Sequence, residues 1–282
     1  MNYRHAFHAG NFADVLKHTV LTLALERLRE KDRPLLVLDT HAGAGRYDLG
    51  EARAGRTGEA ASGIRRLLAR KAHPDPLRRY LEIVRGFDRR LGGDGRNVRH
   101  YPGSPRIVRA LMRPMDRLIA CEMQSDEGLA LRREFAGDRQ VEVRRSDGYA
   151  ALKAVLPPPE RRALVLIDPP FEARDEFERL QRALKQAFRR FATGTYLIWY
   201  PVKTATAVAG LKAFLSGAGL HRALWAELQV VAEREAGLAR AGGVLVNAPW
   251  PIEDSLAEIG PFLADALGGK DGRFETDWLA KD

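Results

Sequence analysis

The tetrapeptide Asp168-Pro169-Pro170-Phe171 follows a run of five apolar residues, 163–167. The run predicts a buried strand, and the prolines end it because they fix φ and carry no N–H. A rigid turn of this kind presents the Asp168 carboxylate and the Pro169 carbonyl as two hydrogen-bond acceptors. They could hold the hydrogens of an exocyclic amine on a nucleobase while Phe171 stacks on the ring and Asp168 takes the released proton.

Carboxylates also end three other predicted strands. Asp39 ends the run 35–39, Glu122 ends the run 117–122, and Asp147 follows the run that starts at residue 141. In an open α/β sheet, ligands bind beyond the carboxyl ends of the strands. Each acid taken singly is equally well explained as a cap of the next helix. The four together favour a ligand site at one edge of a sheet.

The turn "THAGAG" (40–45) brings His41, Gly43 and Gly45 to the same edge. Asp48 stands where a dinucleotide fingerprint requires a third glycine, which argues against an NAD site. No Gly-Lys-Ser/Thr follows, so a P-loop is excluded. The pattern D-x-x-x-G-x-G, with Glu122 after the next strand, resembles that of S-adenosylmethionine (SAM) methyltransferases. The glycines would let the backbone approach the cofactor, and Glu122 would accept its ribose hydroxyls. Holding the amine of the base in line with the methyl group of SAM would account for much of the rate enhancement.

Strands alternating with helices predict a mostly parallel α/β sheet with helices on both faces. The resemblance to SAM methyltransferases implies that this sheet is Rossmann-like and seven-stranded. The first helix, 11–29, carries a polar stripe of Asn11, Asp14, Lys17 and His18. The expected strands are 35–39, 117–122, 141–147, 163–168, 195–200 and 242–247, and the other expected helices are 125–136, 148–156, 175–191 and 203–216.

The interval between the first two strands is about 77 residues long, far more than one helix and two turns need. Its segment 50–103 holds 12 Arg and 1 Lys against 6 Asp or Glu, a net of +7 out of +9 for the chain. We therefore predict a basic helical insertion, 50–103, on a methyltransferase domain formed by 1–49 and 104–282. A clustered basic surface attracts polyanions such as nucleic acids. The alternative is that the arginines of this segment are scattered over the surface and only solvated, without forming a binding site.

Composition narrows the class of protein further. At 45% apolar residues the chain of 282 residues is a folded one, and no apolar run approaches the roughly 18 residues that span a bilayer. The first residues lack the apolar region of a secretory signal, and a single cysteine excludes a disulfide framework, so we expect a cytoplasmic protein without a membrane partner. His5 and His8 lack companion ligands, so no metal is expected. Cys121 lies inside a strand, which argues against cysteine-dependent cytosine methylation.

Taken together, these motifs closely resemble one family, the bacterial 23S ribosomal RNA adenine-N6 methyltransferases that act alone on naked or partly assembled RNA. The resemblance covers nearly the whole chain. It runs through "YRHAFHAGNFADVLKH" (3–18), "LDTHAGAGRYDLG" (38–50), "YPGSP" (101–105), "LIDPPFE" (166–172), "RFATGTYLIWYP" (190–201) and "VNAPW" (246–250). It implies a Rossmann-like enzyme that uses SAM, and we expect a monomer.

Site residues follow from the resemblance position by position. It implies a catalytic acid at Asp168, within the turn that includes Pro169 and Phe171, and an RNA contact at Tyr3, with Arg4, His5 and Lys17 near the site. Implied cofactor contacts are His18, His41, Ser104, Glu122, Asp147 and Gly148, beside the glycines Gly43 and Gly45.

The aromatic residue of the turn departs from the family pattern, which has tyrosine where this chain has Phe171. Phenylalanine is also common in guanine-N2 enzymes, so guanine-N2 or cytosine-N4 methylation remains an alternative. DNA as the substrate, a catalytically inactive RNA-binding protein and a protein-glutamine methyltransferase remain open as well, although the last normally has asparagine in place of Asp168.

Overall fold

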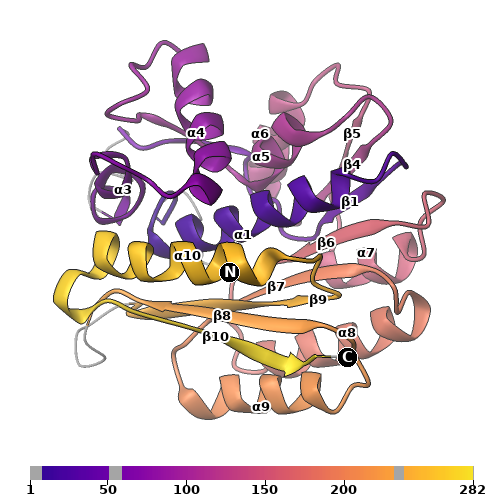
Figure 1. The fold of residues 1–282 in the computed structure, drawn as a ribbon. Coiled ribbons are helices and arrows are strands. Elements are labelled where there is room, and N and C mark those ends of the chain that lie inside the picture. The colour runs from indigo at the N-terminus through magenta and orange to yellow at the C-terminus, as the bar shows by residue number, and fades with distance from the viewer. Residues whose placement is uncertain (1–7, 51–58, 232–237, 282) are drawn as a thin grey trace.

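Five neighbouring strands of one sheet run parallel in a computed structural model, which describes residues 8–50, 59–231 and 238–281. Three further strands extend the sheet in antiparallel fashion. The order is β10-β8-β9-β7-β6-β1-β4-β5, so that β1 lies between β6 and β4 (Figure 1). The strands are β1 Leu36–Asp39, β4 Arg117–Cys121, β5 Val141–Arg144, β6 Ala163–Ile167, β7 Thr195–Pro201, β8 Ala223–Gln229, β9 Arg240–Val246 and β10 Arg273–Ala280.

The predicted Rossmann-like α/β class is confirmed, but the count of seven strands is wrong, because the described residues form eight in this sheet. The strands β8 and β10 had not been predicted. In β10, Glu275 and Asp277 alternate with Phe274 and Trp278, as befits an edge strand that pairs only with β8. Such a strand lacks the continuous apolar run by which the buried strands were recognised.

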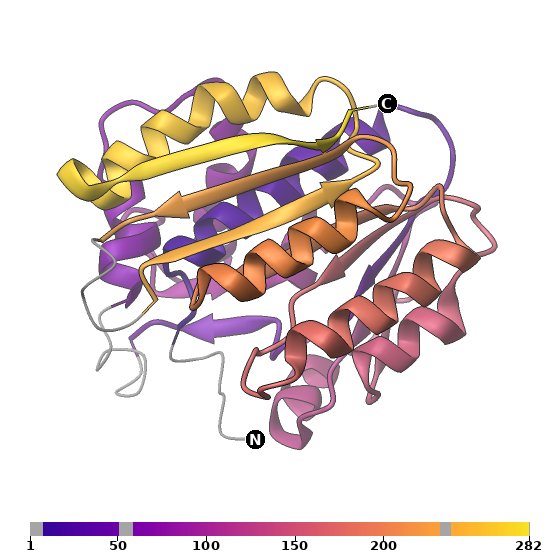
Figure 2. The ribbon, with the colours of Figure 1, turned by 90° about the horizontal axis from the view of Figure 1, so that it is seen from below.

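Helices cover both faces of the sheet (Figures 1 and 2). One hydrophobic core joins the sheet to α1 and α10, and the other joins it to α7, α8 and α9. None of the described helices is both long and apolar enough to cross a membrane. The helices of the two layers and their neighbours are α1 Phe12–Arg29, α5 Ser104–Leu111, α6 Ser125–Glu134, α7 Gly148–Val155, α8 Glu176–Arg190, α9 Ala205–Ser216 and α10 Ile252–Leu263.

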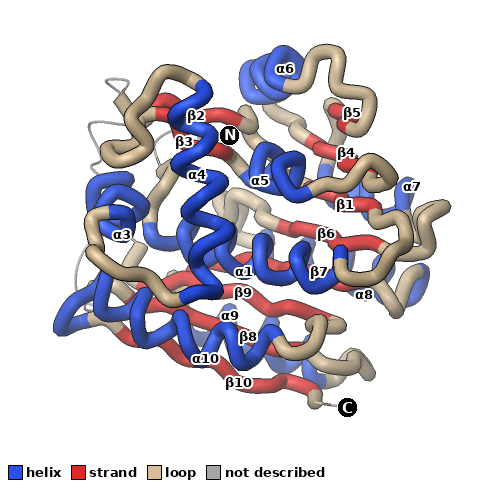
Figure 3. Tube along the Cα trace, turned by 45° about the horizontal axis from the view of Figure 1, so that its top comes forward, coloured by secondary structure: helices blue, strands red, loops and turns tan. Residues whose placement is uncertain are grey.

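Helix α1 is buried on every side over most of its length. Asn11 caps it by accepting a hydrogen bond from the Asp14 backbone N–H at 2.9 Å, and every residue from Phe12 to Leu25 is buried. A helix on a protein surface would expose one polar face. Here α1 lies between the sheet and further helices (Figure 3), so its polar stripe is enclosed within the protein.

The segment after β1 is helical, and its helices cover α1 together with α5 and α10. It forms a π-helical turn at Ala61–Arg65, the short α3 (Arg66–Leu68) and α4 (Arg78–Arg90), and its last strand, β3 (His100–Pro102), pairs with β2 (Arg46–Asp48). Apart from Phe87, the buried hydrophobic side chains in its described part belong to the same hydrophobic core as α1. The division of the chain into a domain and a subdomain at residues 50 and 103 stays a prediction.

Gly63 determines how closely this segment approaches α1. A Cβ built on Gly63 would lie 2.1 Å from the Gly10 carbonyl oxygen, which is backbone and cannot move aside. Gly63→Ala should therefore lower the free energy of unfolding by about 1–3 kcal/mol, the usual cost of overpacking a core.

Gly210→Ala is the matched control, because Gly210 lies in α9 with open space around its added Cβ. That change should stabilise the protein by about 0.5–1 kcal/mol. Urea unfolding of both variants tests the packing, and a Gly63→Ala variant as stable as the parent would contradict it.

Candidate active site

The acids predicted to follow four strands do gather at one edge of the sheet. Because β6, β1, β4 and β5 are adjacent and parallel, Asp168, Asp39, Glu122 and Asp147 all lie near their carboxyl ends. A cavity of about 320 Å³ opens there. It lies where the strand order reverses, because the chain continues from β1 to β4 and β5 on one side and then to β6 on the other side of β1. Asp168, Glu122 and Asp147 line it, whereas Asp39 is wholly buried behind its wall.

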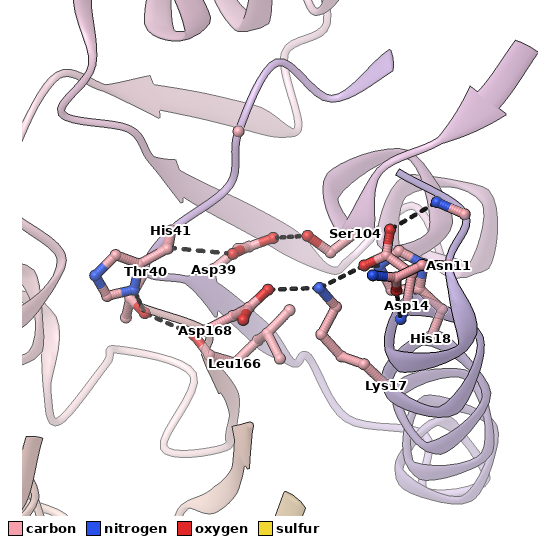
Figure 4. A network of polar contacts seen from close by, with 12 residues as sticks. Asn11, Asp14, Lys17, His18, Asp39, Thr40, His41, Ser104, Leu166 and Asp168 are labelled. Carbon is pink, nitrogen blue, oxygen red and sulfur yellow. Dashed lines mark hydrogen bonds and ion pairs between the residues drawn. The ribbon is translucent and has the colours of Figure 1, made fainter. Parts of the chain in front are cut away.

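A buried ion pair joins the catalytic candidate to α1. The Lys17 Nζ lies 2.5 Å from Asp168 Oδ2 and 2.8 Å from Asp14 Oδ1 (Figure 4). Burial alone would lower the pKa of Lys17, but the two carboxylates outweigh it and raise that pKa above its ordinary value. Lys17 therefore stays charged and holds one oxygen of Asp168 in place, leaving Oδ1 for another donor.

The Pro-Pro turn directs its aromatic ring away from the cavity. Pro169 and Pro170 line the cavity, but Phe171 does not. Its φ of +49° turns the ring against Phe177 and Trp199, with ring centroids 4.8 and 5.8 Å away. Stacking of Phe171 on a base stays a prediction.

The glycine turn binds the acid after β4. Gly43 donates its N–H to Glu122 Oε2 at 2.9 Å, and the N–H of Gln124 reaches Oε1 at 2.7 Å. Each carboxylate oxygen keeps a second lone pair, as the expected contact with two hydroxyls requires. Gly43 has φ +60°, and a Cβ there would lie 2.1 Å from the Tyr47 hydroxyl, so the turn needs glycine. Gly45 lies behind the cavity lining, where its carbonyl accepts from the Gly103 N–H.

Asp39 anchors two further candidates. It accepts from the Ser104 hydroxyl at 2.6 Å and from the His41 N–H at 3.4 Å. Burial raises the pKa of Asp39 to about 7, although the Ser104 bond opposes that rise. Asp39 thus lies behind the wall that Ser104 and His41 present to the cavity.

His41 is neutral and its tautomer follows from its neighbours. Burial lowers its pKa to about 4. The Thr40 hydroxyl donates to the Leu166 carbonyl at 2.9 Å, so it must accept the hydrogen of His41 Nδ1 at 2.8 Å. Nε2 of His41 is therefore a hydrogen-bond acceptor.

Asp147 and Gly148, which follow β5, also line the cavity. Asp147 caps α7 through Oδ1, so the capping alternative holds for this acid even though it also lines the cavity. A Cβ on Gly148 would lie 2.2 Å from the Thr40 carbonyl oxygen, which explains the glycine.

Most of the residues singled out in the sequence thus meet at one cavity. Three of the four residues expected to contact or lie near the RNA, Tyr3, Arg4 and His5, lie outside the described residues. The helix-period stripe pointed to Asp14, but no sequence signal marked four further residues that line the cavity, Thr40, Tyr149, Glu176 and Arg179. The expected site residues that line the cavity are Lys17, His18, His41, Gly43, Ser104, Glu122, Asp147, Gly148, Asp168 and Pro169.

Cys121 offers no nucleophile. It is fully buried in β4, and burial raises the pKa of its thiol to about 11. In the described ranges, no three histidine, cysteine or acidic side chains gather as metal ligands.

Comparison with known proteins gives full-length matches. A family model described as "Ribosomal RNA large subunit methyltransferase D, RlmJ" matches residues 32–280. Proteins named Ribosomal RNA large subunit methyltransferase J from Escherichia coli and Haemophilus influenzae are 41% and 38% identical over 284 residues, covering 100% of both chains in each case. A Legionella pneumophila protein of known crystal structure is 30% identical with a TM-score of 0.88, over 96% of this chain and 98% of that one.

The buried acid Asp39 predicts a pH dependence of stability. Its folded-state pKa of about 7 lies above its ordinary value of 3.8, so the folded protein binds this proton more tightly than the unfolded chain. The stabilising contribution is complete below the unfolded pKa and is lost as the pH rises through the folded pKa. The unfolding free energy of the parent should therefore fall relative to Asp39→Asn, by a few kcal/mol between pH 4 and 8.

Urea unfolding across that pH range measures this difference. The exposed-site variant Asp75→Asn is the control and should follow the parent curve. Parallel curves for the parent and Asp39→Asn would show that Asp39 is not the titrating group.

Proposed function

Because the chain belongs to the family described as Ribosomal RNA large subunit methyltransferase D, RlmJ, we propose that it methylates the N6 amine of an adenine in 23S rRNA, using SAM. Family membership makes the chain an rRNA methyltransferase. The target base, the cofactor and the residue roles are the proposal, as are a naked or partly assembled RNA substrate and action as a monomer.

The observation that carries the proposal is the Asp168 carboxylate held at the cavity by Lys17. With Oδ2 bound to Lys17, Oδ1 of Asp168 and the Pro169 carbonyl are acceptors for the two hydrogens of an exocyclic amine. Holding those hydrogens directs the nitrogen lone pair, and Asp168 is placed to take the proton that leaves. The base must be flipped or drawn from a loop to reach this depth.

The cavity residues suit SAM, which supplies an activated methyl group on its sulfonium. Glu122 is placed to accept hydroxyls, and neutral His41 offers an acceptor at Nε2. Met123, 61% exposed at the cavity, offers apolar surface for a planar base. These groups match a ligand that carries a ribose, a purine and an amino acid.

Replacement of Asp168 should separate binding from chemistry. Asp168→Ala and Asp168→Asn should lower the methylation rate by at least about 100-fold, the scale of a lost general base. SAM affinity by calorimetry should change only a few-fold. Glu172→Gln, an exposed acid beside the same turn, is the control and should retain full activity.

Nucleoside mass spectrometry of rRNA fragments and matched DNA, treated with the parent enzyme and labelled SAM, identifies the product. N6-methyladenosine in rRNA supports the proposal. N2-methylguanosine or N4-methylcytidine as the product would show that the target base is guanine or cytosine instead of adenine. Methylation of the DNA would show that RNA is not required as the substrate. An active Asp168→Ala variant would refute the catalytic role of Asp168.

The arginines of α4 should bind RNA phosphates. Arg85 and Arg89 are four residues apart on one helix face, and neither has an ion pair within the described residues. A double change of both to Glu should weaken RNA binding and reduce the dependence of log K on log salt by about two. Arg189→Glu in α8, on the other face of the sheet, is the control, and equal losses in both variants would contradict the assignment.

A further inference from the structure

Three buried side chains form a hydrogen-bonded row that runs from the basic segment to the cavity. Tyr80 of α4, Tyr101 of β3 and His18 of α1 are each at most 1% exposed. The Tyr80 and Tyr101 hydroxyl oxygens are 2.9 Å apart, and the Tyr101 hydroxyl is 2.8 Å from His18 Nδ1. His18 in turn lines the cavity. The row therefore joins a helix of the segment 50–103 to the candidate site.

The direction of these hydrogen bonds follows from Tyr80. Its hydroxyl is fully buried, and Tyr101 is its one hydrogen-bond partner among the described residues. Tyr80 must then donate to the Tyr101 oxygen, and Tyr101 must donate to His18 Nδ1. The reverse direction would leave the Tyr80 hydrogen buried without an acceptor, which protein interiors rarely tolerate. Nδ1 of His18 is thus an acceptor, and the hydrogen of the neutral ring is on Nε2.

Two further contacts hold the ring in this orientation. The His18 and Tyr101 rings stack with centroids 5.7 Å apart and planes inclined by 27°. On the other edge of the imidazole, Nε2 lies 4.0 Å from Asp14 Oδ1, and a nearby carboxylate favours a hydrogen on that nitrogen. Packing and charge therefore support the same tautomer.

We propose that Tyr101, supported by Tyr80, is a positioning residue that holds His18 as its Nε2–H tautomer, so that His18 donates a hydrogen bond to an anionic group in the cavity. The anionic group is the carboxylate of SAM, an identification that rests on the proposed function. His41 has the opposite tautomer and accepts at Nε2. One donating and one accepting imidazole suit the zwitterionic amino acid part of such a ligand.

The test compares Tyr101→Phe with Tyr80→Phe. Both variants lose the bond between the two tyrosines, but only Tyr101→Phe loses the bond to His18. The ¹⁵N chemical shifts of the His18 ring, assigned by loss of its signals in His18→Gln, report the tautomer in the ligand-free protein. The parent and Tyr80→Phe should show Nε2–H, whereas Tyr101→Phe should show a mixture of tautomers. Calorimetry should give a SAM Kd within about twofold of the parent for Tyr80→Phe and about tenfold weaker for Tyr101→Phe.

The proposal is overturned if His18 of the parent bears its hydrogen on Nδ1, or if Tyr101→Phe matches Tyr80→Phe in both tautomer and affinity. Should Tyr101→Phe fail to fold, the tautomer in the parent and in Tyr80→Phe decides the matter. Because the NMR measurement needs no ligand, it separates this proposal from the proposed function, which would fail instead through absent methyl transfer by the parent enzyme.

Discussion

The charged Lys17 ammonium, buried between Asp14 and Asp168, is the interaction on which the arrangement of the site depends. A buried ammonium without partners costs several kcal/mol, so α1 can only occupy its central position if both carboxylates come to it. Asp14 is supplied by the helix itself, whereas Asp168 comes from the end of β6, 151 residues along the chain. The ion pair therefore fixes α1 to the sheet edge and fixes Asp168 relative to the cavity.

Strand order does the rest of the positioning. Parallel pairing of β1 with β4 and β6 brings three turns to one edge. The hydrogen bond from Gly43 to Glu122 and the close backbone contact of Gly148 with Thr40 hold them there. The basic segment 50–103 packs on α1, the same helix that supplies Lys17 and His18. A single buried helix thus joins the most basic segment of an rRNA methyltransferase to Asp168, the carboxylate proposed to be catalytic.

Sequence patterns predicted the fold class, because buried strands and the turns after them leave local signals. Together with the family resemblance they also predicted ten of the 22 residues that line the cavity. They did not predict that the polar stripe of α1 is buried, since that depends on helices distant in the chain. Nor could they predict the orientation of Phe171, whose ring direction follows from a positive φ and from contacts with Phe177 and Trp199. The edge strand β10 was missed because polar residues alternate along it.

A double-mutant cycle on Lys17 and Asp168 tests the central claim most directly. The unfolding free energies of the parent, Lys17→Met, Asp168→Asn and the double variant give the coupling between the two side chains. The ion pair predicts a coupling of at least about 2 kcal/mol, with the double variant less damaged than the sum of the single ones. A coupling below about 0.5 kcal/mol, the size of an exposed surface pair, would show that Lys17 does not hold Asp168 in place.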